Sequence, residues 1–274
     1  MSEGLGLLVE DCGHAEFLGS VQSPPAIFGA VDLDSIPKSW FPPLIVESQG
    51  STNSCAGHTS ALASSHANYV ATGEVVRFSR RFAYITAQSE GGFIGSDQGT
   101  SIESLRNAQD RYGCCLEVDD PFTTQYRPTW SQDAAKHAAK HKHHGDAPYD
   151  LRDWDRAVDW ATDKRCILIG TRWQSGQDSC GAIEDIRTVK SGVFRGYHAR
   201  LIVGWDRVSR AELGLKCQNS HSERWADGGR STITREAWEW WLRDPNFCAI
   251  GFNAIDEVEP QRRSWKKSTV GDVC

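Results

Sequence analysis

The stretch "ESQGSTNSCAGHTSALASSHANYV", residues 47–70, carries the pattern that decides the fold of this chain. Ser54 is a good N-cap residue, and the alanine-rich run that follows it continues to Gly73, a typical C-terminal stop. The pattern predicts a helix of about five turns that begins at Cys55. The N-terminus of a helix carries a partial positive charge, which favours a thiolate at this position. Cys55 is therefore a candidate nucleophile; the alternative is one more small buried residue among nine cysteines.

The composition is that of a folded, globular protein. Of the 274 residues, 39% are hydrophobic and 24% are charged with both signs mixed, unlike a disordered chain. This length can bury one large core or two lobes. The net charge of -6 gives no electrostatic footprint for nucleic acid, and we expect the compact basic run "QRRSWKK" at 261–267 to be a solvated tail. We therefore expect no nucleic acid partner.

Targeting and redox signals indicate a soluble protein of a reducing compartment. The N-terminus has no basic region, and its apolar run "LGLL" is too short for a signal peptide. The chain has no apolar stretch of about 18 residues, so we expect no membrane partner. The nine cysteines are irregularly spaced, without a C-x-x-C pair, and N-x-S/T glycosylation sites are absent from the sequence. We expect free thiols and a cytoplasmic location, in a bacterium or a virus-infected host cell.

Composition and hydrophobic periodicity divide the chain into four parts. Residues 1–35 are rich in glycine, proline and acidic residues, and predict an extended N-terminal arm. Residues 36–145 predict a helical lobe that carries Cys55, residues 146–258 a β-rich lobe, and residues 259–274 a basic tail. The predicted fold class is α+β, with a helical half followed by a strand-rich half.

Individual segments support this division. "SIESLRNAQDRYG", which ends at Gly113, has apolar residues at helical spacing and predicts a second helix. In the second half, "LRDWDRAVDWATD" predicts a short helix, while "CILIGTRW" and "HARLIVGW" are continuous apolar runs that predict buried strands. "STITREAWEWWLRD" and "FCAIGFNAI" add a further turn or helix and a final strand.

A reactive thiol needs a positive environment or an adjacent base, and we expect the base to be a histidine. His198 follows Gly196 at the entry of a buried apolar strand, where an unpaired polar ring would be costly. Further along, Asn219 can orient an imidazole through its side-chain oxygen, and Trp225 can form a wall of the site. Taken alone, His198 would be a satisfied strand-end histidine and Asn219 a loop or cap residue.

Other histidines are weaker candidates. His58 lies three residues after Cys55 on the same helix, and packing between the lobes is a better interpretation of it than a role as base. His137 and His141 have the i,i+4 spacing of a metal-binding pair, but carboxylates and thiolates at matching spacing are lacking in the sequence. We therefore expect no metal site.

Together these segments resemble the papain-like cysteine peptidases. "SQGSTNSCA" is similar to the nucleophile motif of that family, "GYHARLIVGWD" to its histidine motif, and "NSHSERW" to its asparagine motif. "DQGTSIESLRNAQDRYGCCLEVDDPF" is similar to the family segment between the nucleophile helix and the second lobe. The resemblance runs from Ile36 to Ile255 in the order of the family. It implies a two-lobed papain-like fold, with a helical left lobe and a strand-rich, barrel-like right lobe.

The resemblance implies a role for each matching residue. Cys55 would be the nucleophile, His198 its base and then acid, and Asn219 the group that holds the imidazole. Gln49 would donate its side-chain amide to the oxyanion together with the backbone N–H of Cys55. Cys55 and His198 would rest as a thiolate–imidazolium pair. Gly99 matches the glycine region along which a substrate backbone pairs as an extended strand.

Three positions depart from the family pattern. Thr52 replaces a disulfide-forming cysteine, and Ala56 replaces the usual tryptophan after the nucleophile, which opens space beside the thiol. His221 replaces the tryptophan that shields the bond between asparagine and histidine, and should leave that bond wetter and weaker or narrow the pH window of activity. We place His221 and Trp225 beside Gly99 on the substrate side of the site. Residues 1–35 are too short for a long inhibitory prosegment, so we expect no zymogen of that kind.

The predicted function is a cysteine endopeptidase that forms a Cys55 thioester with its substrate. Two alternatives stay open: a weak or inactive papain-like fold that serves as an interaction module, and a transpeptidase or amidase with the same Cys-His-Asn chemistry. We expect a polypeptide substrate, no cofactor, and a monomer.

Overall fold

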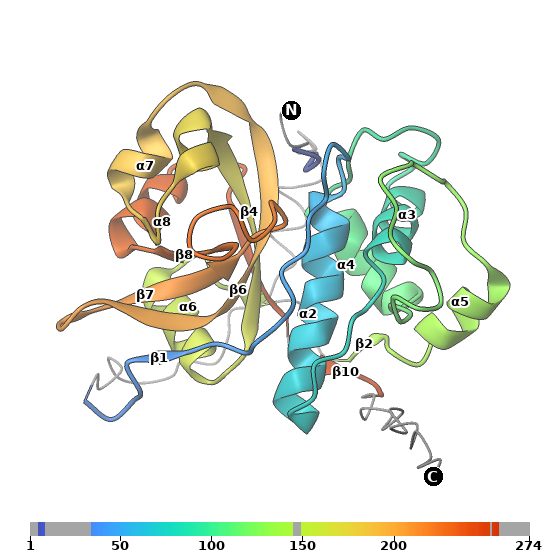
Figure 1. Cartoon of the computed structure of the whole chain (residues 1–274), viewed down its shortest axis with the longest axis horizontal. Coiled ribbons are helices and arrows are strands. Elements are labelled where there is room, and N and C mark those ends of the chain that lie inside the picture. Colours follow the sequence, from blue (N-terminus) through green and yellow to red (C-terminus); the bar gives the residue numbers. More distant parts are fainter. Residues whose placement is uncertain (1–4, 9–33, 145–148, 253, 258–274) are drawn as a thin grey trace, which may run out of the picture.

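The computed structural model describes residues 5–8, 34–144, 149–252 and 254–257. They form a helical lobe and a sheet lobe, with helix α2 (Cys55–Thr72) between them (Figure 1). The predicted arm lies outside the described residues except at 5–8 and 34–35, and the predicted basic tail lies outside them entirely. The two-lobed α+β fold expected from the sequence is confirmed.

The helical lobe is built around α2, which begins at Cys55 as predicted. Gly73 ends it in the left-handed conformation (φ 75°), where its N–H donates to the carbonyl of Tyr69 at 2.7 Å. The other elements of this lobe are α3 (Arg80–Glu90), α4 (Ile102–Arg111), α5 (Gln132–Ala138) and the short strand β2 (His143–His144). Because α2 packs on α3 and α4 on one side and on the sheet lobe on the other, nearly its whole circumference is buried.

Helix α3 was not predicted from the sequence. Its first two residues, Arg80 and Arg81, are typical of a solvent-exposed turn, yet both are buried. Arg80 donates to Glu47 at 2.7 Å and to Glu117 at 2.5 Å, and Arg81 pairs with Asp120. These carboxylates lie far from the helix in sequence, so only the folded chain shows why two arginines can open a buried helix.

The sheet lobe contains a largely antiparallel sheet with the strand order β3-β9-β4-β6-β7-β8-β5. Its strands are β3 (Tyr149–Asp150), β4 (Cys166–Gln174), β5 (Ile183–Glu184), β6 (Phe194–Ser209), β7 (Glu212–Gln218), β8 (Arg230–Ile233) and β9 (Cys248–Phe252). Helices α6 (Trp154–Thr162), α7 (Ile186–Lys190) and α8 (Arg235–Trp241) and the 3₁₀ turn η1 (Ser175–Ser179) complete the lobe. The short helix and the buried strands predicted for this half are confirmed.

The central strands of the sheet are buried on both faces. On β6, Ala199, Leu201 and Val203 point into the core shared with α2, while Ile202 and Trp205 point into the core formed with α6 and α8. Successive side chains of a strand point to opposite faces, so two cores favour apolar residues at successive positions, as at Leu201, Ile202 and Val203. This explains why the strand sequence shows an apolar run and no alternation, with the buried Arg200 as the exception.

Each half of the sequence contributes a strand to the other lobe. Strand β1 (Ser39–Trp40) pairs with β6, where Trp40 is opposite Trp205. Near the end of the described chain, β10 (Ala254–Ile255) pairs with β2 of the helical lobe. Strands β1 and β10, each paired with a strand of the other lobe, connect the two lobes at the edges of their interface.

Two further properties of the described residues are the state of the cysteines and the character of the helices. The described cysteines are all free and buried: Cys55, Cys114, Cys115, Cys166, Cys180, Cys217 and Cys248. Within the described ranges, no helix combines the length and the apolar character needed to span a membrane.

Candidate active site

Three elements bring the predicted site residues together. Cys55 is the first residue of α2, His198 lies on β6, and Asn219 directly follows β7, which pairs with β6. The backbone of Ala199, the residue after His198, forms a hydrogen bond with the Cys55 thiol. The nucleophile helix and the histidine strand are thus in contact at the residues that the sequence singled out.

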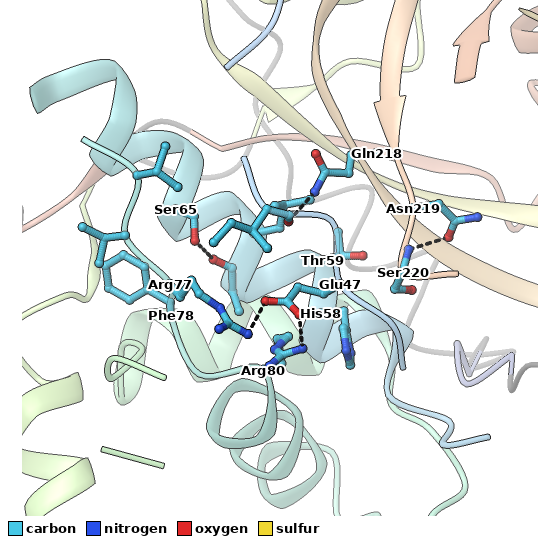
Figure 2. Close-up of a pocket in the computed structure, with 15 residues that line it drawn as sticks. Glu47, His58, Thr59, Ser65, Arg77, Phe78, Arg80, Gln218, Asn219 and Ser220 are labelled. Carbon is cyan, nitrogen blue, oxygen red and sulfur yellow. Dashed lines mark hydrogen bonds and ion pairs between the residues drawn. The ribbon is translucent and has the colours of Figure 1, made fainter. Parts of the chain in front are cut away.

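The ring of His198 is fixed by Asn219. Nε2 of His198 lies 2.7 Å from Oδ1 of Asn219. This oxygen also accepts the backbone N–H of Ser220 at 2.7 Å, as Figure 2 shows. Because an amide oxygen only accepts, Nε2 must carry the proton in this bond, which leaves Nδ1 as the basic nitrogen. Within the described part of the chain, Nδ1 makes no hydrogen bond. The bond therefore selects the tautomer that can take a proton from a thiol.

Aromatic rings enclose the His198–Asn219 bond. The ring of His221 lies 4.5 Å from that of His198, and Trp173 makes an edge contact with His198 at 4.8 Å. Trp225 extends this cluster, with its ring 6.1 Å from Trp173 and its Nε1 donating to a backbone carbonyl. His198 is fully buried and Asn219 is 3% exposed. The expectation of a wetter bond is therefore wrong for this structure, because Trp173 and His221 together cover the bond.

Trp173 was not singled out from the sequence. It lies on β4, two residues after Thr171, which is directly opposite His198 in the strand register. Directly opposed residues share a face of the sheet, and so do residues two apart on one strand. A correct strand pairing would therefore have placed Trp173 beside His198, but the sequence alone does not give that register.

The side chain of Gln49 forms hydrogen bonds both to its own loop and to the loop that carries Asn219. Its Nε2 donates to the carbonyl of Thr52 at 2.7 Å, and its Oε1 accepts the hydroxyl of Ser220 at 2.5 Å. The side chain is fully buried. The structure thus brings Gln49, Cys55 and the Asn219 loop together.

Burial sets the protonation of the central pair. It raises the pKa of the Cys55 thiol to about 11, and hydrogen bonds from the backbone of Ala199 and Gly6 offset this in part. Burial, followed by the nearby His221, holds the pKa of His198 well below its usual value. Both directions favour a neutral thiol and a neutral imidazole. These two pKa directions differ from the thiolate–imidazolium pair expected from the sequence, because both side chains are fully buried in this structure.

Gly99 and its neighbour Thr100 have different roles from those expected. The N–H of Gly99 donates to the hydroxyl of Tyr84 at 3.0 Å, and its carbonyl accepts Nε2 of Gln88 at 2.9 Å. Both backbone groups are therefore used within the helical lobe. Thr100 instead offers its N–H and carbonyl to an extended segment, Leu5–Leu8. In this structure the extended segment thus pairs with Thr100, and the pairing of a substrate with Gly99 stays a prediction.

A buried ion pair lies behind the aromatic cluster. Nη1 of Arg200 lies 2.6 Å from Glu184, and both side chains are fully buried. The guanidinium also lies over the ring of Trp173, 5.1 Å from its centre. Arg200 interrupts the apolar run "HARLIVGW", and a charge within a buried strand was a signal that could have pointed to this pair.

The other histidines of the sequence analysis do not join the site. His58 packs edge-on against Phe122 at 4.7 Å, and its Nδ1 lies 3.1 Å from the carbonyl of Ser54, in agreement with a packing role. His137 pairs with Asp119. Among the described residues, no group of three or more potential ligands forms a metal site.

A pocket borders the site on the side of Asn219 and Ser220. On its opposite wall, Glu47 forms ion pairs with Arg77 at 2.6 Å and with Arg80 at 2.7 Å (Figure 2). Glu47 comes shortly before Gln49 in the chain. These ion pairs therefore anchor the segment that carries Gln49 to the helical lobe.

The comparisons with known proteins agree with the geometry. The model of the papain family of cysteine proteases matches residues 43–255. The chain therefore belongs to the papain family of cysteine proteases, a class of hydrolases, as the sequence resemblance predicted. None of the curated protein sequences compared with the chain matches it.

Several solved structures share the fold. Xylellain, a cysteine protease from Xylella fastidiosa, is similar with a TM-score of 0.72 at 18% identity, over 92% of this chain and 96% of its own. Digestive procathepsin L2 from Tenebrio molitor gives 0.64 at 18% identity, over 91% and 78%. Procathepsin B S9 from Trypanosoma congolense gives 0.62 at 15% identity, over 91% and 86%. At these identities the likeness establishes the fold.

Proposed function

We propose that the chain is a cysteine endopeptidase in which Cys55 is the nucleophile and His198 the general base and acid. One observation carries the proposal: the bond from His198 to Asn219 presents a basic Nδ1 in the interface where α2 begins with a thiol. A buried imidazole held in one tautomer beside a cysteine is the arrangement that nucleophilic thiol catalysis requires.

The proposed reaction follows from these positions. Nδ1 of His198 takes the proton of the Cys55 thiol, and Sγ attacks the carbonyl carbon of the substrate peptide bond. The resulting oxyanion accepts the backbone N–H of Cys55, which helix α2 leaves unused in its first turn, and an N–H of the Gln49 amide. His198 returns the proton to the leaving amine, and a thioester remains on Cys55. Water activated by His198 then hydrolyses the thioester and releases the acid.

The buried rings give this mechanism a dry environment. Once the thiolate and imidazolium have formed, their attraction is stronger in a medium of low dielectric constant than in water. Trp173 and His221 keep solvent away from the Nε2 bond that holds the ring in place. The same rings would therefore serve orientation and charge stabilisation together.

The two alternatives from the sequence analysis predict different products. A transpeptidase or amidase would use the same thioester but pass it to an amine or act on a side-chain amide, so analysis of the products separates it from an endopeptidase. An inactive interaction module would retain the fold without a reactive thiol. The joint placement of Cys55, His198, Asn219 and Gln49 favours a catalytic function over this last alternative.

The proposal is tested by mass spectrometry of the intact protein after reaction with an epoxysuccinyl peptide probe. We expect a single adduct on the wild type and on Cys166→Ala, a matched control that removes another buried thiol. Cys55→Ala should give no adduct, and His198→Ala should slow labelling about a hundredfold or more. A folded wild type that never gains an adduct, or an adduct that persists in Cys55→Ala, would refute the proposal.

A further inference from the structure

A buried turn, residues 49–52, carries the Gln49 amide that the proposed reaction uses. The backbone N–H of Thr52 donates to the carbonyl of Gln49 at 3.2 Å, which closes a four-residue turn. Gly50 has a positive φ of 58°, a conformation that glycine adopts without strain at the second position of such a turn. Gln49 is fully buried, and Thr52 is 4% exposed. The turn thus brings its first and fourth residues together in the interior.

The side chains of Gln49 and Thr52 hold one another. The hydroxyl of Thr52 donates to the carbonyl of Gln49 at 2.8 Å, and Nε2 of Gln49 donates to the carbonyl of Thr52 at 2.7 Å. Because a carbonyl only accepts, the nitrogen of the Gln49 amide must face Thr52. The two bonds run in opposite directions between the same two residues. The direction of the Gln49 amide therefore depends on the position of Thr52.

A second hydroxyl fixes the hydroxyl of Thr52. Oγ of Ser54 lies 2.6 Å from Oγ1 of Thr52. A hydroxyl has one proton, and that of Thr52 is used on the carbonyl of Gln49, so Ser54 is the donor in this bond. Ser54 directly precedes Cys55 and is fully buried. The hydrogen bonds therefore run without a break from the residue before the thiol to the residue that carries the amide.

The loop after β7 holds the other side of Gln49. Oε1 of Gln49 accepts the hydroxyl of Ser220 at 2.5 Å, and the backbone N–H of Gln49 donates to the carbonyl of Ser220 at 2.9 Å. The backbone N–H of Ser220 in turn donates to Oδ1 of Asn219. The Gln49 amide thus lies between two sets of hydrogen bonds, and Thr52 provides one of them.

Thr52 is one of the positions at which the chain departs from the family pattern, where a disulfide-forming cysteine is usual. A hydroxyl can donate and accept at the same time, whereas a disulfide sulfur has no proton to donate. Thr52 uses both capacities, since it donates to Gln49 and accepts from Ser54. The departure therefore supplies hydrogen bonds that reach the amide of Gln49.

We propose that Thr52 is a positioning residue of this protein: its hydroxyl holds the Gln49 amide in the direction from which it donates to the oxyanion. The proposal rests on the proposed endopeptidase function, because it names a residue on which that reaction depends. A donor stabilises an oxyanion only when it is already aimed at the place where the charge develops. Without its hydroxyl, Thr52 would lose its side-chain bonds to Gln49 and Ser54, and the turn could move away from that alignment.

The test compares hydrolysis of a peptide substrate by the full-length wild type and by Thr52→Val. Valine has the shape of threonine without the hydroxyl, so the substitution removes hydrogen bonds and little volume. We expect kcat to fall about tenfold or more with KM nearly unchanged, because the oxyanion exists only on the way to the thioester. Thr52→Ser keeps a hydroxyl and should recover most of the rate. Thr86→Val is the matched control, because it removes a buried hydroxyl that donates within α3, and it should keep the wild-type kcat.

Two further measurements separate positioning from a general structural role. Exchange of the Cys55 thiol with dithiodipyridine forms an S–S bond to one pyridyl sulfur and releases the other as pyridinethione, which takes the thiol proton. This reaction forms no oxyanion at a carbonyl, so Cys55 should exchange at equal rates in the wild type and in Thr52→Val. Gln49→Ala removes the oxyanion donor, and adding Thr52→Val to it should cause no further loss of kcat.

The outcomes distinguish the positioning proposal from the peptidase proposal. An unchanged kcat in a folded Thr52→Val, a parallel fall in kcat and thiol exchange, or losses that add to those of Gln49→Ala would overturn the positioning proposal and leave the peptidase proposal intact. Thr52→Ala takes the place of Thr52→Val should the valine variant not fold. A folded wild type that hydrolyses no peptide would instead refute the peptidase proposal, and the positioning proposal with it.

Discussion

At the scale of single residues, two buried histidines outside the site show how burial determines protonation. His58 and His66 lie in the interior, and burial lowers the pKa of His58 to about 3 and that of His66 to about 4. The charge of Arg80 adds to the effect at His58, while the carbonyl of Val203 offsets part of it at His66. Both rings are therefore kept neutral in the folded protein, whereas in the unfolded chain they titrate near their usual value.

These two histidines predict a loss of stability in acid. Below the ordinary histidine pKa the unfolded state binds protons that the native state does not, so stability is complete above pH of about 6.5 and is lost as pH falls. Each such ring contributes a slope of about 1.4 kcal/mol per pH unit. Urea unfolding at about pH 7 and about pH 5.5 should show a smaller loss in His66→Gln than in the wild type. An identical loss in both proteins would show that His66 is protonated in the folded state.

Some residues of the candidate site could be predicted from the sequence and others could not. Cys55, His198 and Asn219 could be selected because each lies within a short motif with its own local geometry. Trp173 and Thr100 could not, because their roles arise from the strand register and from contact with a segment far away in the chain. The sequence resemblance placed substrate pairing on Gly99, and that expectation stays a prediction; in this structure Gly99 donates to Tyr84 and accepts from Gln88.

At the scale of secondary structure, the elements that could be predicted are those whose signals lie within their own stretch of sequence. Helix α2 is an alanine-rich run between a cap residue and Gly73, and the core strands are short apolar runs, so local patterns indicate both. Helix α3 was missed because its arginines are buried through ion pairs with distant carboxylates. The position of Leu5–Leu8 was also beyond prediction, because its apolar run is short and its partners come from both lobes.

The buried pair between β5 and β6 gives a prediction at this scale. Glu184→Gln leaves Arg200 charged and fully buried without a counter-charge, which should destabilise the protein by about 3–5 kcal/mol. The control Asp155→Asn breaks the exposed pair with Arg235 and should cost less than about 1 kcal/mol. Urea unfolding midpoints measure both. A similar small effect of the two substitutions would show that Arg200 finds another partner or that water reaches it.

At the scale of the whole molecule, the two lobes hold one another through several different links. Strands β1 and β10 cross between the lobes, α2 is shared by both, and Leu5–Leu8 bridges the cleft by pairing with Thr100 and Tyr197. The lobes are therefore joined at several separate places along the interface that contains Cys55 and His198.

The most direct test of the account is peptide hydrolysis by the wild type, compared with Cys55→Ala. A denatured protein substrate is incubated with each, and mass spectrometry detects new peptide termini. We predict internal cleavage by the wild type and none by Cys55→Ala. Cleavage that persists without Cys55, or a folded wild type whose thiol reacts with the probe but which releases no peptides, would contradict the account.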